Sequence, residues 1–429
     1  MTIPSEISEI LFSLTSVFTQ PSAQIFLRLA IGWILCPGRH TITNIIQFAD
    51  PNRIRAHDAY HRFFRGAAWS LQTLFHLWTL FLVKRLRPSG TIWLHADDSV
   101  IKKTGRKTAG AKYCRDAVRS TRRNTVYVWG LQIVPLCLRV NPPWGGEPLS
   151  IPVNVRVYRE GGPSLLDLVE EMIFQLARWL PDRDFRLVVD GAYATLAGRD
   201  LPRTHIVSRI RHDAALYAPP PKVKRRRRGR PRKKGERLPK PADMAKTARK
   251  WRVVETLERG RSKTRLVYTR IVLWYKVSKD RPLMLVISRD PTGREKDDFF
   301  FTTDLDLSPA RVVSEYANRW AIEDTFKNLK QYLGAEHPQC WKGDGPRKAI
   351  GFACFIYGVV WLWYLRHGYD SKRLETAEWY PDKSTPSFRD AISCLRAYLW
   401  RKRFFATSCS KADMQEFCET LITALSRAA

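Results

Sequence analysis

Four side chains that could act together on a phosphate group lie on one predicted helix, which begins near residue 308. A helix advances about 100° per residue, so Tyr316, Arg319, Glu323 and Lys330 would share an arc of roughly 60°. A carboxylate flanked by two cations and a phenol suits a site where a metal ion works beside a phosphate backbone. The alternative is a solvated face with one Arg–Glu pair, which is the commoner arrangement on a single helix.

Carboxylates also end two predicted strands. Residues 91–99 read as a strand ending in Asp97 and Asp98. Alternation places Asp97 on the more polar face, so Asp97 is the first candidate and Asp98 the second. A buried apolar strand, 185–190, delivers Asp190 at its carboxyl end, the edge where ligand chemistry gathers in α/β sheets. Acidic residues at strand ends are often turn or cap residues, so neither position predicts a site by itself.

The spacing Tyr-x2-Arg-x3-Glu-x6-Lys, which residues 316–330 carry in full, resembles the signature of one branch of DDE transposases from bacterial insertion sequences. The resemblance implies a ribonuclease-H-like α/β core in which Asp97, Asp190 and Glu323 are the catalytic, metal-binding carboxylates. The metal it implies is Mg²⁺, with Mn²⁺ as a substitute. The family's reaction is cut-and-paste transposition, which in this branch often passes through a DNA hairpin.

The same resemblance implies a set of DNA contacts. The tyrosine, arginine and lysine of the signature would contact the DNA end, and here these are Tyr316, Arg319 and Lys330. In related transposases a β-rich insertion lies between the second Asp and the Glu, and one of its aromatic residues stacks on a base flipped from the DNA end. Trp274 is the candidate for that role, with core packing as the alternative.

The composition predicts a polyanionic partner. The chain has 73 Lys plus Arg against 41 Asp plus Glu, a net charge of +32, and its pI is near 10.2. Residues 221–237 hold +10 of this charge, so +22 remains elsewhere. This segment predicts a mobile loop, and its sequence from Arg228 through Gly to Arg230 resembles an AT-hook that lies in the minor groove. A nonspecific phosphate-binding tether is the alternative.

Secretion and membrane insertion are not favoured. The 8 cysteines form no C-x-x-C pair and no zinc-like spacing, which favours reduced thiols in a cytoplasmic protein, here one associated with the bacterial nucleoid. The N-terminus shows no secretory signal. The apolar stretch 349–365 is shorter than the usual span of about 20 residues, so it predicts a buried core helix.

The predicted elements divide the chain into five regions. The fold class is α/β, a ribonuclease-H-like core interrupted by a β-rich insertion, with an N-terminal helical DNA-binding region. Near the N-terminus, the short helices 41–49 and 56–64 could form a helix-turn-helix-like DNA reader or simply pack together. The regions are 1–88 (helical, DNA-binding), 89–210 (first part of the core), 211–288 (basic loop and β insertion), 289–368 (second part of the core, with the Glu323 helix) and 369–429 (helical tail).

These observations predict a metal-dependent DNA transposase. Its partner would be double-stranded DNA, both the terminal inverted repeats and the target, and it would work as a homodimer on DNA. A transposase-derived DNA-binding regulator without catalysis is the main alternative, and acidic residues at all three positions argue against it. A site-specific endonuclease that cleaves without joining would show the same three carboxylates. A basic membrane-associated protein is a more distant alternative.

Overall fold

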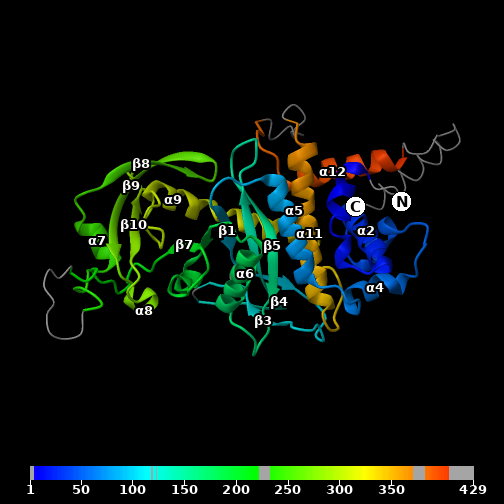
Figure 1. Ribbon diagram of the computed structural model, residues 1–429, viewed down its shortest axis with the longest axis horizontal. Coiled ribbons are helices and arrows are strands. Elements are labelled where there is room, and N and C mark those ends of the chain that lie inside the picture. Colours follow the sequence, from blue (N-terminus) through cyan, green and yellow to red (C-terminus); the bar gives the residue numbers. More distant parts are fainter. Residues whose placement is uncertain (1–3, 117–118, 122, 222–231, 371–381, 405–429) are drawn as a thin grey trace.

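One mixed β-sheet forms the middle of the molecule (Figure 1). The computed structural model describes residues 4–116, 119–121, 123–221, 232–370 and 382–404. In this described part the strands are β1 Ile92–Ala96, β2 Ser99–Lys102, β3 Lys112–Arg115, β4 Tyr127–Val140, β5 Leu149–Val157, β6 Phe185–Val189, β7 Thr204–Arg209, β8 Arg252–Glu258, β9 Arg261–Val272, β10 Leu283–Arg289 and β11 Asp298–Thr302. Their order is β2-β4-β1-β6-β7-β11-β10-β9-β8, and β3 and β5 also pair with β4.

Three neighbouring strands at the centre of the sheet run parallel. β1 pairs with β6, with Leu94 opposite Leu187, and β6 pairs with β7, with Leu187 opposite Ile206. β4 lies antiparallel to β1 on its other side, and β5 lies antiparallel to β4. An antiparallel meander followed by parallel strands is consistent with the expected ribonuclease-H-like core.

Beyond β7 the sheet continues into the region expected as a β insertion. β11 is antiparallel to β7, and β10, β9 and β8 follow in turn, each antiparallel to its neighbour. Figure 1 shows β8, β9 and β10 at one end of the molecule and the N-terminal helices at the other. These strands therefore extend the central sheet and do not form a separate one. β2 and β3 were not predicted, because runs of four residues are too short for alternation to be recognised.

Most helices pack beside the β4–β5 part of the sheet or fill the end that holds the N-terminus, whereas those at 241–247, 275–278 and 309–318 lie with β8–β10 at the other end (Figure 1). The helices are α1 Ser5–Phe12, α2 Gln20–Leu35, α3 Ile42–Ala49, α4 His57–Arg65, α5 Leu71–Leu86, α6 Leu165–Trp179, α7 Pro241–Thr247, α8 Tyr275–Ser278, α9 Pro309–Asn318, α10 Ala321–Gln331, α11 Gly345–Trp363 and α12 Phe388–Phe404. Local sequence sets several starts. At α6, for example, Ser164 forms a capping box with Asp167. In α3 and α4 the faces carrying Ile45 and Phe63 are buried in the core.

The apolar helix α11 lies inside the protein. Among the described residues, Gly345–Gly368 is the one helix long and apolar enough to cross a membrane, and 94% of its most apolar window is buried. It packs beside α5 (Figure 1), where Trp78 lies so close to Gly358 that an added Cβ would come within 2.6 Å of the ring. Trp78 Nε1 also donates to the carbonyl of Pro152 in β5 (2.9 Å). The helix is therefore part of the core that positions the sheet.

The first helix of the predicted tail packs against α2. Arg396 of α12 donates from Nε to the carbonyl of Ile34 (2.6 Å) and from Nη2 to that of Cys36 (2.7 Å). These bonds satisfy two carbonyls at the carboxyl end of α2, where no following helical turn supplies N–H donors. The second helix predicted in the tail, 410–426, lies outside the described residues.

Buried polar contacts join the N-terminal helices to the segment between α10 and α11. Trp33 Nε1 donates to the carbonyl of Leu333 (2.9 Å), and the backbone N–H of His40 donates to Nδ1 of His337 (3.1 Å). His40 Nε2 lies 3.1 Å from the carbonyl oxygen of Trp33. Burial, together with the charge of Arg396, lowers the pKa of His40 to about 4. The imidazole is therefore neutral in the folded protein at pH 7.

This pKa predicts a loss of stability on acidification. The unfolded chain binds the His40 proton with a pKa near 6.5 and the folded chain with a pKa near 4. Between these two values the unfolded chain binds more protons than the folded chain. Each unit by which the pH falls in this range therefore lowers the free energy of unfolding by up to about 1.4 kcal/mol. We expect the urea midpoint to fall from pH 7 to pH 5, and to fall less in His40→Gln. Equal falls in both proteins would contradict this.

Candidate active site

The two aspartates lie at the same edge of the sheet. Asp97 directly follows β1 and Asp190 directly follows β6, and these two strands are parallel neighbours. Asp190 caps the short 3-10 helix Gly191–Gly198, where its Oδ1 accepts the N–H of Ala192 (2.9 Å). Every residue of β1 is buried, so the polar face expected to carry Asp97 is not present. The reason is that the strand is covered on both sides, as parallel strands usually are.

Arg319 joins Asp97 to Glu323. Its Nη1 donates to Oδ2 of Asp97 (2.5 Å), and its Nη2 lies 3.7 Å from Oε1 of Glu323. Burial raises the pKa of Asp97 to about 6. The charge of Arg319 opposes this rise, and the charge of Asp190 adds to it. Burial also raises the pKa of Glu323, with Arg319 again opposing and Asp190 again contributing. The three carboxylates therefore share one electrostatic environment.

Asp98 has different surroundings. Its Oδ1 accepts the hydroxyl of Tyr193 (2.9 Å), and its Oδ2 accepts Nε2 of Gln132 (2.7 Å). Both carboxylate oxygens of Asp98 thus bond to neighbouring side chains. Those of Asp97 are bonded too, but Oδ1 accepts the backbone N–H of Asp98 (2.9 Å) and Oδ2 contacts Arg319, which also reaches Glu323. The geometry favours Asp97 over Asp98 as the residue for chemistry at this edge.

The helix that carries the signature is broken in two. The sequence predicts one helix, but Arg319 and Trp320 separate α9 from α10. Hydrogen bonds there tighten to a three-residue spacing: Trp320 N–H bonds to the Ala317 carbonyl (3.3 Å), and Glu323 N–H to that of Trp320 (2.9 Å). The four signature residues therefore do not form one straight stripe. No Pro or Gly signals the break, which coincides with the ion pair between Arg319 and Asp97.

The remaining signature residues lie on either side of this break. Tyr316 packs its ring against Phe300 (4.7 Å between centroids) and lies 5.5 Å from the guanidinium of Arg319. Lys330 Nζ donates to Oγ of Ser99 at the start of β2 (3.0 Å). Tyr316 is therefore next to the carboxylates, while Lys330 lies about two helical turns beyond Glu323, against β2.

The predicted base-stacking residue Trp274 packs against Phe301 of β11. Trp274 is half-buried, with its ring 5.8 Å from that of Phe301. In the part of the chain that the structure describes, no hydrogen bond or ring contact joins Trp274 to the three carboxylates. Arg228 and Arg230 lie outside the described residues.

Two arginines near the site were not predicted from the sequence. Arg209 ends β7, pairs with Asp298 and lies 5.7 Å from the ring of Tyr316. Arg259, in the turn between β8 and β9, lies 4.1 Å from the ring of Trp320. Arg209 could have been found from its place at the end of a strand parallel to β6. For Arg259 the sequence gives no signal, because its position depends on how the hairpin packs against α9.

A buried hydrogen-bonded network lies beneath the carboxylates. His95, two residues before Asp97, has Nδ1 2.6 Å from Oγ of Ser150. Thr325, two residues after Glu323, donates to the carbonyl of Ser150 (2.8 Å). Ser150 therefore connects the strand of one acid to the helix of another, and this fixes their separation.

Breaking this network should loosen the site. Thr325→Val keeps the side-chain shape but leaves the buried carbonyl of Ser150 without its hydroxyl donor, which should cost about 1–3 kcal/mol. We expect a lower melting temperature together with slower cleavage. Thr247→Val is a matched control, because Thr247 is exposed and its hydroxyl bonds, among the described residues, only to carbonyls of its own helix. A stability loss no larger than that of the control would contradict the role of Thr325.

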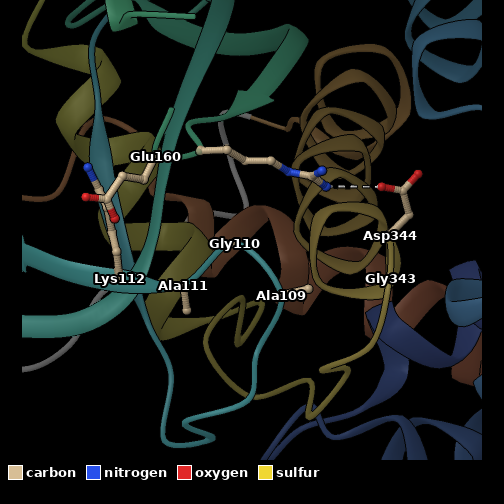
Figure 2. A pocket seen from close by; sticks show the side chains of 8 residues that line it. Ala109, Gly110, Ala111, Lys112, Glu160, Gly343 and Asp344 are labelled. Atoms are coloured by element: carbon tan, nitrogen blue, oxygen red, sulfur yellow. Dashed lines mark hydrogen bonds and ion pairs between the residues drawn. The ribbon is translucent and has the colours of Figure 1, made fainter. Parts of the chain in front are cut away.

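Two cavities lie near these elements. A cleft of about 1070 Å³ is bounded by Arg259 and Arg261 of the β8–β9 turn, by Asp324 and Lys327 of α10, and by residues 383–389. Figure 2 shows a second cavity, of about 580 Å³, which lies between residues 109–112, 159–160 and 343–344. Arg159 Nη2 lies 3.3 Å from Asp344 Oδ1 there. None of the three carboxylates lines either cavity, but Asp324, the residue after Glu323, lines the first cleft. The candidate active site is therefore the acidic sheet edge next to the first cleft.

The donor set at this edge fits a hard divalent cation, because all three candidate ligands are carboxylates. In the present conformation, no three His, Cys, Asp or Glu side chains of the described residues form a group that could hold a metal ion. The positive charge between Asp97 and Glu323 comes instead from Arg319.

Acidic residues at the ends of parallel central strands, facing an acidic helix, characterise a class of α/β nucleases with a ribonuclease-H-like core. The sequence family of DDE superfamily endonucleases matches residues 14–281, and the chain belongs to that family. No curated protein matches the chain. The matched span includes Asp97 and Asp190 and ends before Glu323, so the assignment of the third acid depends on the signature and the fold.

Proposed function

We propose that this DDE superfamily endonuclease is the transposase of a bacterial insertion sequence, which excises and integrates the element by cut-and-paste transfer. The observation that carries the proposal is the contact of Arg319 with both Asp97 and Glu323 at the strand edge that also bears Asp190. Residues far apart in sequence thus meet where phosphoryl transfer would need three carboxylates.

In this proposal Asp97, Asp190 and Glu323 hold two Mg²⁺ ions, with Mn²⁺ as a substitute. Bound there, the ions supply Lewis acidity for the attacking and leaving oxygens of an in-line displacement at phosphorus. Arg319 is largely buried, and it orients the carboxylates of Asp97 and Glu323 toward each other. The network under Ser150 keeps the strand and the helix at a fixed separation.

The proposed substrate is double-stranded DNA, bound at the terminal inverted repeats of the element and at the target. Tyr316, Arg319 and Lys330 would contact the DNA end, and Trp274 would stack on a flipped base. Arg228 and Arg230 would bind the minor groove, and the N-terminal helices would read sequence. Because two element ends must be brought together, the proposal includes a homodimer on DNA. It also includes a DNA hairpin intermediate and a location at the nucleoid in the bacterial cytoplasm.

The test is Mg²⁺-dependent excision from a plasmid that carries the gene with its native flanking DNA, comparing wild type with Asp190→Ala. Metal-dependent breaks at two defined ends, absent in the variant, would support the transposase and identify the terminal sequences. Breaks without strand joining would favour a site-specific endonuclease. If neither protein cuts and both bind the flanks, the chain is a DNA-binding regulator on a transposase fold.

A further inference from the structure

The turn between β8 and β9 places an arginine beside Glu323. The guanidinium of Arg259 lies over the ring of Trp320, 4.1 Å from its centroid, and Trp320 is the residue at the break between α9 and α10. The carbonyl of Trp320 accepts the N–H of Glu323 (2.9 Å), so the ring that Arg259 covers lies one tight helical turn before Glu323. The β8–β9 hairpin therefore contributes a cation to the site, although it is far from the signature in sequence.

Several backbone contacts hold this turn in place. Arg259 has φ of 50°, in the left-handed region that side chains rarely adopt, and its N–H donates to Oδ1 of Asn318 in α9 (3.0 Å). Gly260 follows with φ of 74° and lies so close to Gly146 that an added Cβ would come within 2.5 Å of its backbone. Strained backbone persists where the surroundings determine it, and it clusters at functional sites.

The guanidinium of Arg259 is held in place by Trp320, but its N–H donors form few bonds with the described part of the protein. Its one ion pair within the described residues is with Glu147, at 4.0 Å, the outer limit of such a contact. Both side chains are more than 40% exposed, so solvent screens this pair and it contributes little. No side-chain hydrogen bond from Arg259 is found in the part of the chain that the structure describes. A planar group with five N–H donors is therefore available to a ligand.

The space in front of Arg259 suits a phosphate backbone. Arg259 lines the cleft together with Arg261 and with Lys327, which lies one helical turn beyond Glu323. Arg261 and Lys327 are exposed, and neither has an ion pair among the described residues. The cleft is also lined by the acidic residues Glu147, Glu258, Glu295, Asp298 and Asp324. A chain of phosphates that runs along the cleft beside Glu323 would meet the three cations, which lie on the β8–β9 turn and on α10.

We propose that Arg259 is a phosphate-binding residue of the active site, which leaves Glu147 and takes one phosphate of the DNA strand that lies across Glu323. Trp320 holds the guanidinium plane ready for two parallel N–H···O bonds. The proposal depends on the proposed function for the identity of the strand, and it adds a residue to which neither the signature nor the family match assigns a role.

The experiment measures binding of a fluorescein-labelled random-sequence duplex by anisotropy, without divalent metal, across a range of salt concentrations. Arg259→Asn is the main variant, because Asn tolerates the left-handed backbone of this turn. Loss of one phosphate contact should reduce the slope of log Kd against log salt by about 0.9. Arg259→Lys should keep the slope near that of wild type but weaken binding several-fold, because an ammonium cannot form the paired bonds.

The matched control is Arg294→Asn, which removes the same charge from the exposed turn between β10 and β11. If Arg259→Asn changes the slope no more than this control does, the phosphate-binding role is overturned. That result would leave the transposase proposal intact. Failure of the transposase proposal would appear instead as equal cutting of the plasmid by wild type and Asp190→Ala, and this result does not depend on the salt dependence of binding.

Discussion

Glu323→Gln should abolish DNA cleavage and leave duplex binding intact. The substitution keeps the side-chain volume and removes the anionic ligand, whereas the basic surfaces that bind DNA are unchanged. Metal-assisted charge stabilisation contributes several kcal/mol to such transition states, and each 1.36 kcal/mol is a tenfold change in rate. We therefore expect cleavage to fall about 10³-fold or more in the plasmid excision assay.

The neighbouring carboxylate provides the control. Asp324→Asn makes the same change of charge one residue away, on a side chain that lines the cleft and is not one of the three proposed ligands. It should keep most of the cleavage activity. Comparable losses in both variants would mean that general electrostatics, and not metal ligation by Glu323, explains the effect.

Arg319→Ala should destabilise the metal-free protein by about 3–5 kcal/mol, because it leaves the carboxylate of Asp97 without its buried partner. With the opposing charge gone, the pKa of Asp97 should rise further above its ordinary value. Mg²⁺ should then raise the melting temperature of this variant more than that of wild type, because a bound cation restores the lost positive charge.

The measurement is thermal unfolding with and without Mg²⁺. Arg186→Ala is the control, since it breaks a partly buried pair with Asp304 (2.6 Å), which is not one of the three acids. That variant should lose stability without any additional gain from Mg²⁺. The same Mg²⁺ response in wild type, Arg319→Ala and Arg186→Ala would argue against a cation site between Asp97 and Glu323.

The sequence predicted most of the elements because their patterns are long and locally determined. α2 and α5 have apolar faces bounded by turn residues, and the strand ending at Asp190 is a continuous apolar run. It could not predict that β8–β10 would join the central sheet, because strand order depends on pairing between distant segments. The interruption between α9 and α10 was missed for a similar reason. Its local residues favour helix, and the contact of Arg319 with Asp97 links positions far apart in the chain.

The candidate site was predictable only as far as the signature extends. Spacing pointed to Glu323, and strand ends pointed to Asp97 and Asp190, but spacing could not show that Arg319 would lie between two of them. Alternation and the Asp-x-Ser/Thr pattern of the resembling family both selected Asp97 over Asp98, and the two-sided burial of β1 invalidates the first of these arguments. Both carboxylate oxygens of Asp98 accept hydrogen bonds from side chains of β4 and of the 3-10 helix after β6, whereas Asp97 contacts Arg319, and the choice of Asp97 stays a prediction.

The parallel pairing of β1 with β6 also has a consequence for synthesis on the ribosome. Asp97 and Asp190 can meet once β6 has emerged, but Glu323 follows only after another 133 residues. At 5–20 residues per second this delay is roughly 7 to 27 s. During this delay the nascent sheet carries Asp97 and Asp190 and lacks Glu323. Competence to cut DNA is therefore acquired late, after most of the sheet has formed.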